Sequence, residues 1–192
     1  MALAAVNLAE LPLKSILLWS LVGTSALVGL NMLYVMATKR GAETKVVSRH
    51  WFSKTIYGIF LFLTAALAIS SFGSILQSGH LGGYALLAHL TAAGAFVFVL
   101  LAVAFLFLPN GASPSQRGYT RDSRWWLSRW SAVGLVVAGV LTAATMFTSM
   151  LPILDTQGLL EFAMLHRYAG LATVIFAVIH AYTMVCTHWN WR

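Results

Sequence analysis

Five long apolar segments constrain the fold of this chain more than any other feature. They cover residues 14–37, 54–76, 83–108, 130–152 and 161–186. Each is long enough to cross the ~30 Å hydrocarbon core of a bilayer as a helix. Of the 192 residues, 59% are hydrophobic and only 9% are charged, which is too little charge for the surface of a soluble protein. The sequence therefore predicts an all-α integral membrane protein with five spans.

Basic residues gather in two of the loops between these segments, and their distribution predicts the orientation. The two groups are Lys39, Arg40, Lys45, Arg49 and Lys54 after the first span, and Arg117, Arg121, Arg124 and Arg129 after the third. By the positive-inside rule both loops lie in the cytoplasm, with the N-terminus outside and the C-terminus inside. The net charge of +7 is thus explained by membrane topology, and nucleic acid is not an expected partner.

The last apolar segment carries two histidines on one face. His166 and His180 are fourteen residues apart, which is nearly four helical turns. Their rings therefore point to the same side within ~40° and lie ~21 Å apart along the helix axis. Ionisable side chains at this depth are costly and need partners. In the predicted orientation, His166 lies ~9 Å below the outer surface and His180 ~10 Å from the inner one.

Two further histidines lie at matching depths on other helices. His89 is six residues into the third span, ~9 Å deep, at the level of His166. His50 precedes the second apolar segment, and a helix that began near Thr44 would bring it to the level of His180. The depths predict the cross-helix pairs His89–His166 and His50–His180. Paired imidazoles inside a helix bundle are typical of bis-histidine ligation of haem iron.

The neighbours of these histidines suit a flat cofactor, although each also has an ordinary structural explanation. Small residues within about a turn of the predicted ligands are Ala92, Ala93, Gly94, Ala169, Gly170, Ala177 and Ala181. They would leave room for a porphyrin, and they also serve helix packing in membranes. Arg49 and Arg167 are candidate partners of haem propionates or interfacial residues that reach toward headgroups. His80 lacks a depth-matched partner and His188 lies at the inner boundary, so neither is expected to bind haem. The chain has one cysteine, Cys186, and no Cys-x-x-Cys-His motif, which excludes covalent c-type haem attachment.

On these residues the chain resembles the membrane cytochrome b subunits of the formate dehydrogenase gamma and Ni/Fe-hydrogenase b-type family, within the bacterial cytochrome b561-like group. Arg49-His50-Trp51 resembles the opening of the family's first core helix, and the next family ligand follows about forty residues on, as His89 does here. The family's last helix carries two ligands with thirteen residues between them, like His166 and His180. The resemblance covers roughly residues 45–188 and implies two non-covalent b-type haems with the same pairing.

The resemblance also implies a role, an organisation and a location. It divides the chain into an extra N-terminal helix with its basic loop, residues 1–43, and a four-helix cytochrome b domain, residues 44–192. It implies a multi-pass subunit of the bacterial inner (cytoplasmic) membrane that links the quinone pool to an extracytoplasmic multihaem cytochrome or iron–sulfur subunit. A quinone would lie near the inner haem, where the candidate contacts are Lys54, Tyr57, Tyr182 and Arg129. The helix at 14–37 and Ser71-Phe72-Gly73, in place of the family's Thr-Gly, depart from the family pattern.

Two other functions stay open at this point. A proton or solute transporter with a histidine relay would favour broken helices or acidic residues near mid-membrane, whereas Glu43, Asp122, Asp155 and Glu161 all fall in predicted loops. A cofactor-free membrane anchor or assembly subunit would use its histidines only for helix packing. No soluble catalytic domain is visible, so we expect an electron-transfer subunit without catalytic residues of its own.

Overall fold

The computed structural model describes residues 12–38, 51–107 and 123–188, and this part of the chain is built from helices. Five helical segments within it are long and apolar enough to cross a membrane, which confirms the prediction of an all-α multi-pass membrane protein. The elements are α1 (Leu13–Thr38), α2 (Trp51–Ala68), η2 (Ile69–Gly73), α3 (Ser74–Ser78), α4 (Gly83–Phe107), α5 (Ser123–Met150) and α6 (Thr156–His188). The second span runs through α2, η2 and α3 as one rod.

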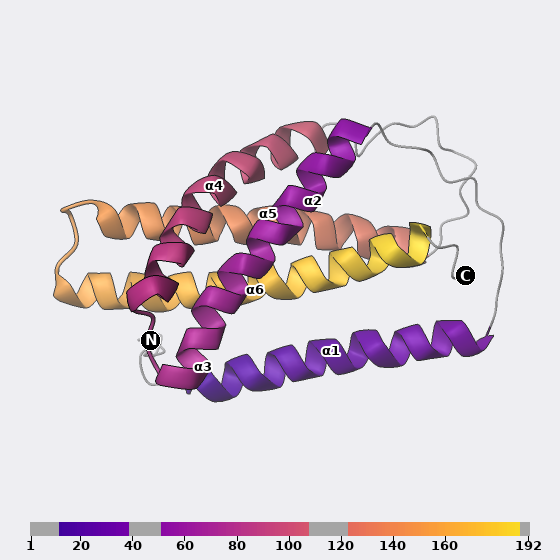
Figure 1. Ribbon diagram of the computed structural model, residues 1–192, viewed down its shortest axis with the longest axis horizontal. Coiled ribbons are helices and arrows are strands. Elements are labelled where there is room, and N and C mark those ends of the chain that lie inside the picture. The colour runs from indigo at the N-terminus through magenta and orange to yellow at the C-terminus, as the bar shows by residue number, and fades with distance from the viewer. Residues whose placement is uncertain (1–11, 39–50, 108–122, 189–192) are drawn as a thin grey trace, which may run out of the picture.

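Two helical hairpins and one peripheral helix make up the structure (Figure 1). α5 and α6 lie side by side in antiparallel directions and form the most extensive contact between elements. The hairpin of α2 and α4 crosses over this pair, and α1 runs along α6. The start of α1, the turn between α3 and α4 and the turn between α5 and α6 all lie toward one end of the bundle (Figure 1).

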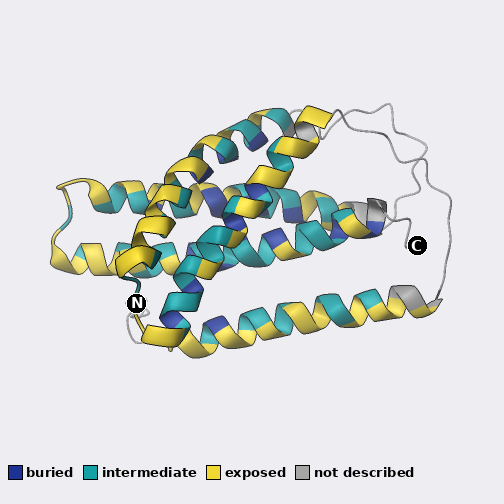
Figure 2. Ribbon diagram, viewed as in Figure 1, coloured by how far each residue is buried: buried dark blue, intermediate teal, exposed yellow. Residues whose placement is uncertain are grey.

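The core consists of two clusters of buried side chains, separated along the bundle. The larger cluster contains Phe60, Phe96, Leu100, Val103, Leu135 and Ala177, and the smaller contains Leu17, Phe72 and Leu171. In the larger one the rings of Phe60 and Phe96 stack with their centroids 5.4 Å apart. Buried positions face the interior of the bundle, whereas α1 is mostly exposed (Figure 2). Large apolar side chains on the outer faces, such as Phe98 and Phe105, are the expected surface for lipid.

The helices extend beyond the apolar segments at their ends. α6 begins at Thr156 because Asp155 caps it: the Gly158 N–H donates to Asp155 Oδ1 at 2.8 Å. Glu161 therefore lies within α6, where Gln157 Nε2 donates to its carboxylate at 3.2 Å, and the prediction that it belongs to a loop was wrong. α5 likewise begins at Ser123, before its apolar segment. Hydropathy marks the part of a helix that meets hydrocarbon, and polar turns continue the helix on either side.

The second span contains a wide turn that hydropathy did not predict. Residues Ile69–Gly73 form a π-helix, η2, inside an otherwise α-helical rod. Such insertions are rare and are frequent at functional sites, because they redirect side chains relative to a regular helix. The rod ends at Gly79, whose φ of 79° is the left-handed conformation that glycine adopts without strain.

A close contact between α5 and α6 at Gly134 supplies a test of this packing. A Cβ atom added at Gly134 would stand 2.6 Å from Cε1 of Phe176. We expect Gly134→Leu to displace the ring and lower stability by about 1–3 kcal/mol, measured as a lower unfolding temperature in detergent. Gly58→Leu is the control, because an added Cβ there meets nothing within 4 Å. Equal unfolding temperatures for the two variants would contradict the close contact.

Candidate functional site

A cavity of about 250 Å³ lies between the second, third, fourth and fifth spans. His89 on α4 and His166 on α6 both line it, so the structure brings this predicted pair together. The wall is otherwise largely apolar and includes Phe72 and Phe96, one from each core cluster. The cavity therefore borders both clusters and places two imidazoles within an apolar surround.

The hydrogen bonds of His166 define which ring nitrogen carries the proton. Its Nδ1 lies 3.0 Å from the backbone carbonyl oxygen of Thr142, which can only accept. The Nδ1 atom is therefore the donor, and in the neutral ring Nε2 carries the lone pair. The hydroxyl of Thr145 lies 3.4 Å from the same Nδ1 and donates to the Thr142 carbonyl at 2.9 Å.

His89 also faces an oxygen with its Nδ1 atom, and this oxygen belongs to a side chain of the π-helix. Its Nδ1 lies 3.1 Å from Oγ of Ser70 in η2. The Ser70 hydroxyl can donate to the Leu67 carbonyl at 3.2 Å and accept from the imidazole, and the Leu67 carbonyl, which can only accept, also hydrogen-bonds the ring. Nε2 of His89 is then the unprotonated nitrogen.

His180, toward the other end of α6, repeats this arrangement. Its Nδ1 lies 3.1 Å from Oγ of Ser131, and the Ser131 hydroxyl donates to the Ser128 carbonyl at 3.0 Å. The ring of Tyr57 on α2 meets the imidazole edge-on, with the centroids 5.7 Å apart. The expected partner His50 and its neighbour Arg49 lie outside the described residues, so the pairing at this level stays a prediction.

The partners on α5 have the same spacing as the histidines on α6. Ser131 and Thr145 are fourteen residues apart, as are His166 and His180, and the antiparallel helices set each hydroxyl against one ring. Both hydroxyl residues are buried, with 2% and 3% of their surface exposed. The predicted site did not include them. The matched spacing on adjacent spans is a signal that could have found this pair, whereas nothing in the sequence marks Ser70.

Small residues border the cavity without filling it. A Cβ added at Gly94 would meet nothing within 4 Å, and one added at Gly170 would only reach the Thr142 methyl at 4.0 Å. These two glycines therefore border open space, unlike Gly134 between α5 and α6. Arg167 also lines the cavity with an exposed side chain that donates to Met164 Sδ at 3.5 Å.

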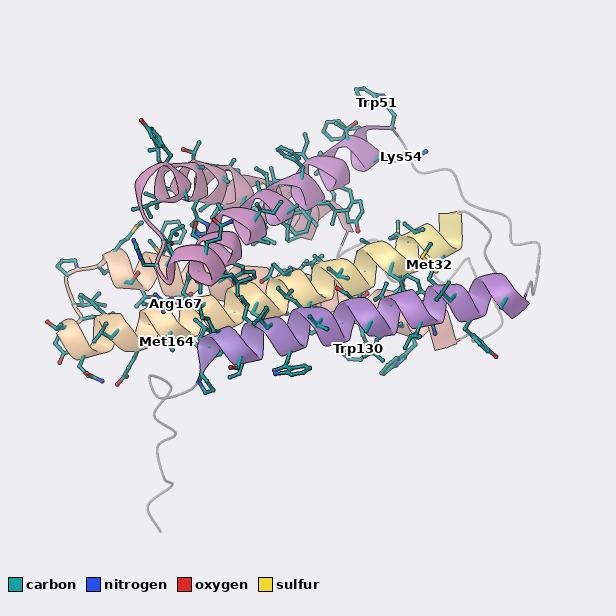
Figure 3. All side chains as sticks on the ribbon, turned by 60° about the horizontal axis from the view of Figure 1, so that its bottom comes forward. Met32, Trp51, Lys54, Trp130, Met164 and Arg167 are labelled. Carbon is teal, nitrogen blue, oxygen red and sulfur yellow. The ribbon has the colours of Figure 1, made fainter. Side chains whose placement is uncertain are left out.

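The four candidate quinone contacts are not all gathered around His180. Tyr57 contacts its ring, whereas the hydroxyl of Tyr182 donates to the side-chain oxygen of Asn31 and so links α6 to α1. Lys54 and Arg129 are exposed. Lys54 lies near the beginning of α2, toward the opposite end of the bundle from Arg167 (Figure 3).

The two histidines outside these pairings differ from those in the bundle. His80 is exposed in the turn before α4, and its Nδ1 lies 3.0 Å from the Ser78 carbonyl. His188 is the last residue of α6, and its side chain is outside the described part of the structure.

The protonation state of the bundle histidines can be measured directly. In nitrogen-15 NMR of the protein labelled in its imidazoles, we expect His89, His166 and His180 to carry their proton on Nδ1, because each Nδ1 lies within hydrogen-bond distance of an oxygen that can accept it. Single His→Gln variants assign the signals. His80 serves as the comparison: its Nδ1 also lies 3.0 Å from a carbonyl, but the ring is exposed, so water competes for this bond and its preference for Nδ1 should be weaker. A proton on Nε2 of any of the three would contradict the hydrogen bonds described here.

Comparison with protein-family models gave no match, and comparisons with curated proteins and with solved structures gave none. The fold and the site therefore stand on the chain's own residues. What they establish is a multi-pass helical membrane protein with two imidazoles lining one intramembrane cavity.

Proposed function

We propose that this chain is a transmembrane electron-transfer subunit that holds two b-type haems by bis-histidine ligation. The observation that carries the proposal is the pair His89 and His166, which line one cavity with Nδ1 engaged as a donor and Nε2 unprotonated. An axial ligand must offer a nitrogen lone pair, and the opposite ring nitrogen of such a histidine ordinarily donates to an oxygen of the protein. Two histidines on different helices, each with an unprotonated Nε2, are the pair of ligands that bis-histidine haem iron requires.

The surroundings of the pair also fit a haem. Gly94 and Gly170 leave space beside the histidines, and the apolar walls match the faces of a porphyrin. Arg167 offers a positive charge at the same cavity for a propionate. A bound haem would supply reversible one-electron oxidation and reduction of its iron, while the chain's residues hold the iron, exclude water and fix the ring tautomers.

The second haem is proposed at the level of His180, with His50 as its other ligand. His180 shares the hydrogen-bonding arrangement of His89, with Ser131 in the place of Ser70. His166 and His180 are fourteen positions apart on α6, ~21 Å along the axis. One helix would then contribute a ligand to each of two haems, at the two levels that electrons must bridge between the membrane surfaces.

We further propose the setting that the sequence predicted for this subunit. The basic loops would face the cytoplasm of a bacterium, with the His89–His166 level near the outer surface. A quinone would bind on the inner side, where Tyr57 already contacts His180 and Lys54, Tyr182 and Arg129 are further candidates. A multihaem cytochrome or iron–sulfur subunit would dock outside. α1 would be an addition to a four-helix haem-binding bundle.

Removal of single histidines tests the two sites. The purified protein reduced with dithionite should show a b-type α-band, with two haems per chain. His89→Ala and His166→Ala should each abolish one and the same haem, and His50→Ala and His180→Ala the other, because each variant would keep only one of the two histidines that hold that haem. His80→Ala is the control and should retain both. An unchanged protein without a b-type band would refute the proposal, and a His50→Ala variant that kept both haems would refute the inner pairing.

A cavity-filling substitution tests the site without touching a ligand. Gly94→Leu adds a side chain that meets no protein atom at its Cβ but enters the cavity, so we expect normal expression with loss of the haem bound by His89 and His166. Gly29→Leu on α1 is the matched control, because its Cβ also meets nothing within 4 Å and its position does not line the cavity. The pyridine haemochrome assay gives haem per chain. Full haem content in Gly94→Leu would contradict this location.

A further inference from the structure

Three imidazoles on the spans face hydroxyls of one kind. Each hydroxyl lies 2.9–3.2 Å from the backbone carbonyl oxygen three residues earlier in the same helix, to which it can donate. The hydroxyl–carbonyl pairs are Ser70 with Leu67, Ser131 with Ser128, and Thr145 with Thr142. A hydroxyl that donates to this carbonyl accepts from the imidazole, and that combination holds the proton of the ring on Nδ1.

The three differ in how directly they serve their histidine. Ser70 and Ser131 each lie 3.1 Å from the Nδ1 atom of their ring. Thr145 is farther, at 3.4 Å, because the backbone carbonyl of Thr142 already takes the proton of His166 at 3.0 Å. The two serines are therefore the side chains on which the imidazole geometry depends most.

The placement of these hydroxyls indicates a role beyond helix packing. Ser131 is 2% exposed inside an apolar helix pair, and a buried hydroxyl is costly there unless its hydrogen-bonding capacity is used. Ser70 lies in η2, the π-helix that interrupts the second span next to His89. Ser131 is thus unusually buried for a hydroxyl and Ser70 lies in a rare type of helix, and each lies within hydrogen-bond distance of one imidazole.

We propose that Ser70 and Ser131 are positioning residues that hold His89 and His180 as Nε2 ligands and lower the reduction potential of the iron each ring binds. The inference rests on the proposed function. A hydrogen bond from Nδ1–H to an oxygen makes the ring more electron-rich and Nε2 a stronger donor. A stronger donor favours ferric over ferrous iron, so loss of the hydroxyl raises the potential.

Redox titration of the haems in the purified full-length protein tests this. Ser131→Ala should raise the potential of the haem that His180→Ala abolishes, with the ratio of reduced to oxidised iron at a fixed ambient potential rising about tenfold, or ~59 mV for one electron. Ser70→Ala should raise the reduction potential of the haem at His89 and His166 by a smaller amount, because the Leu67 carbonyl also hydrogen-bonds the His89 ring. Thr145→Val should cause the smallest shift, since the Thr142 carbonyl stays in place. Ser131→Thr restores a hydroxyl and should return the potential toward its original value.

Ser149→Ala is the matched control. Ser149 lies on the same helix as Ser131 and makes the same bond to the carbonyl three residues earlier, Met146, at 2.8 Å, without bonding an imidazole in the described part of the chain. It should shift neither potential. If Ser131→Ala does not retain its haem, Ser131→Cys is titrated instead and should show the same upward shift, because sulfur is a weaker acceptor.

The outcomes separate this inference from the proposed function. Haems that are present in every variant, with Ser70→Ala and Ser131→Ala titrating like Ser149→Ala, would overturn the positioning role and leave the haem sites intact. An unchanged protein without haem would overturn the proposed function and this inference with it. Nitrogen-15 NMR gives a second reading, because Ser131→Ala should weaken the preference of His180 for a proton on Nδ1.

Discussion

The structure depends on the absence of water from the hydrocarbon core of the membrane. A polar group on a membrane-spanning helix must find its partner within the protein. Serine and threonine hydroxyls on these spans do so by donating to a carbonyl one turn earlier, as Thr64 does to Phe60 and Thr173 to Ala169, each at 2.9 Å. The oxygen of such a hydroxyl can still accept a second hydrogen bond. Where a histidine lies opposite, the oxygen can accept the proton of Nδ1, which leaves Nε2 unprotonated.

The pairing of α5 with α6 then sets the positions of two rings at once. His166 meets Thr145 and His180 meets Ser131, while between them the hydroxyl of Thr173 bonds that of Thr142 at 3.2 Å. A spacing of fourteen residues is two heptads, so the same faces of both helices return to contact at each level. At both levels α5 contributes a hydroxyl and α6 contributes an imidazole. The second imidazole of each proposed site therefore has to come from another part of the chain, either the α2–α4 hairpin that crosses this pair or the segment before that hairpin. His89 meets that requirement at one level.

The parts that sequence could predict are those set by hydrocarbon and by helical repeat. Bilayer thickness selects long apolar segments, which gave the five spans, and a constant rise per residue gave the common depth of His89 and His166. Helix ends and side-chain partners follow other rules. The cap at Asp155 lies in polar sequence that hydropathy does not score, and the turn of η2 that brings Ser70 to His89 changes the helical repeat itself. A count at 3.6 residues per turn cannot place a side chain beyond such a turn.

Glycine serves two opposite purposes in this bundle, and the contrast bears on how the cavity is to be interpreted. At Gly134 it allows α5 and α6 to pack so closely that a Cβ would collide with Phe176, which is the ordinary use of small residues between membrane helices. At Gly94 and Gly170 it borders open space instead. The side chains of Phe147 and Met150, which also line the cavity, are more than half exposed, so the cavity opens toward the surface of the bundle. The glycines that tighten helix packing and those that border the cavity therefore differ in what a larger side chain would meet, and only the second kind leaves room beside His89 and His166.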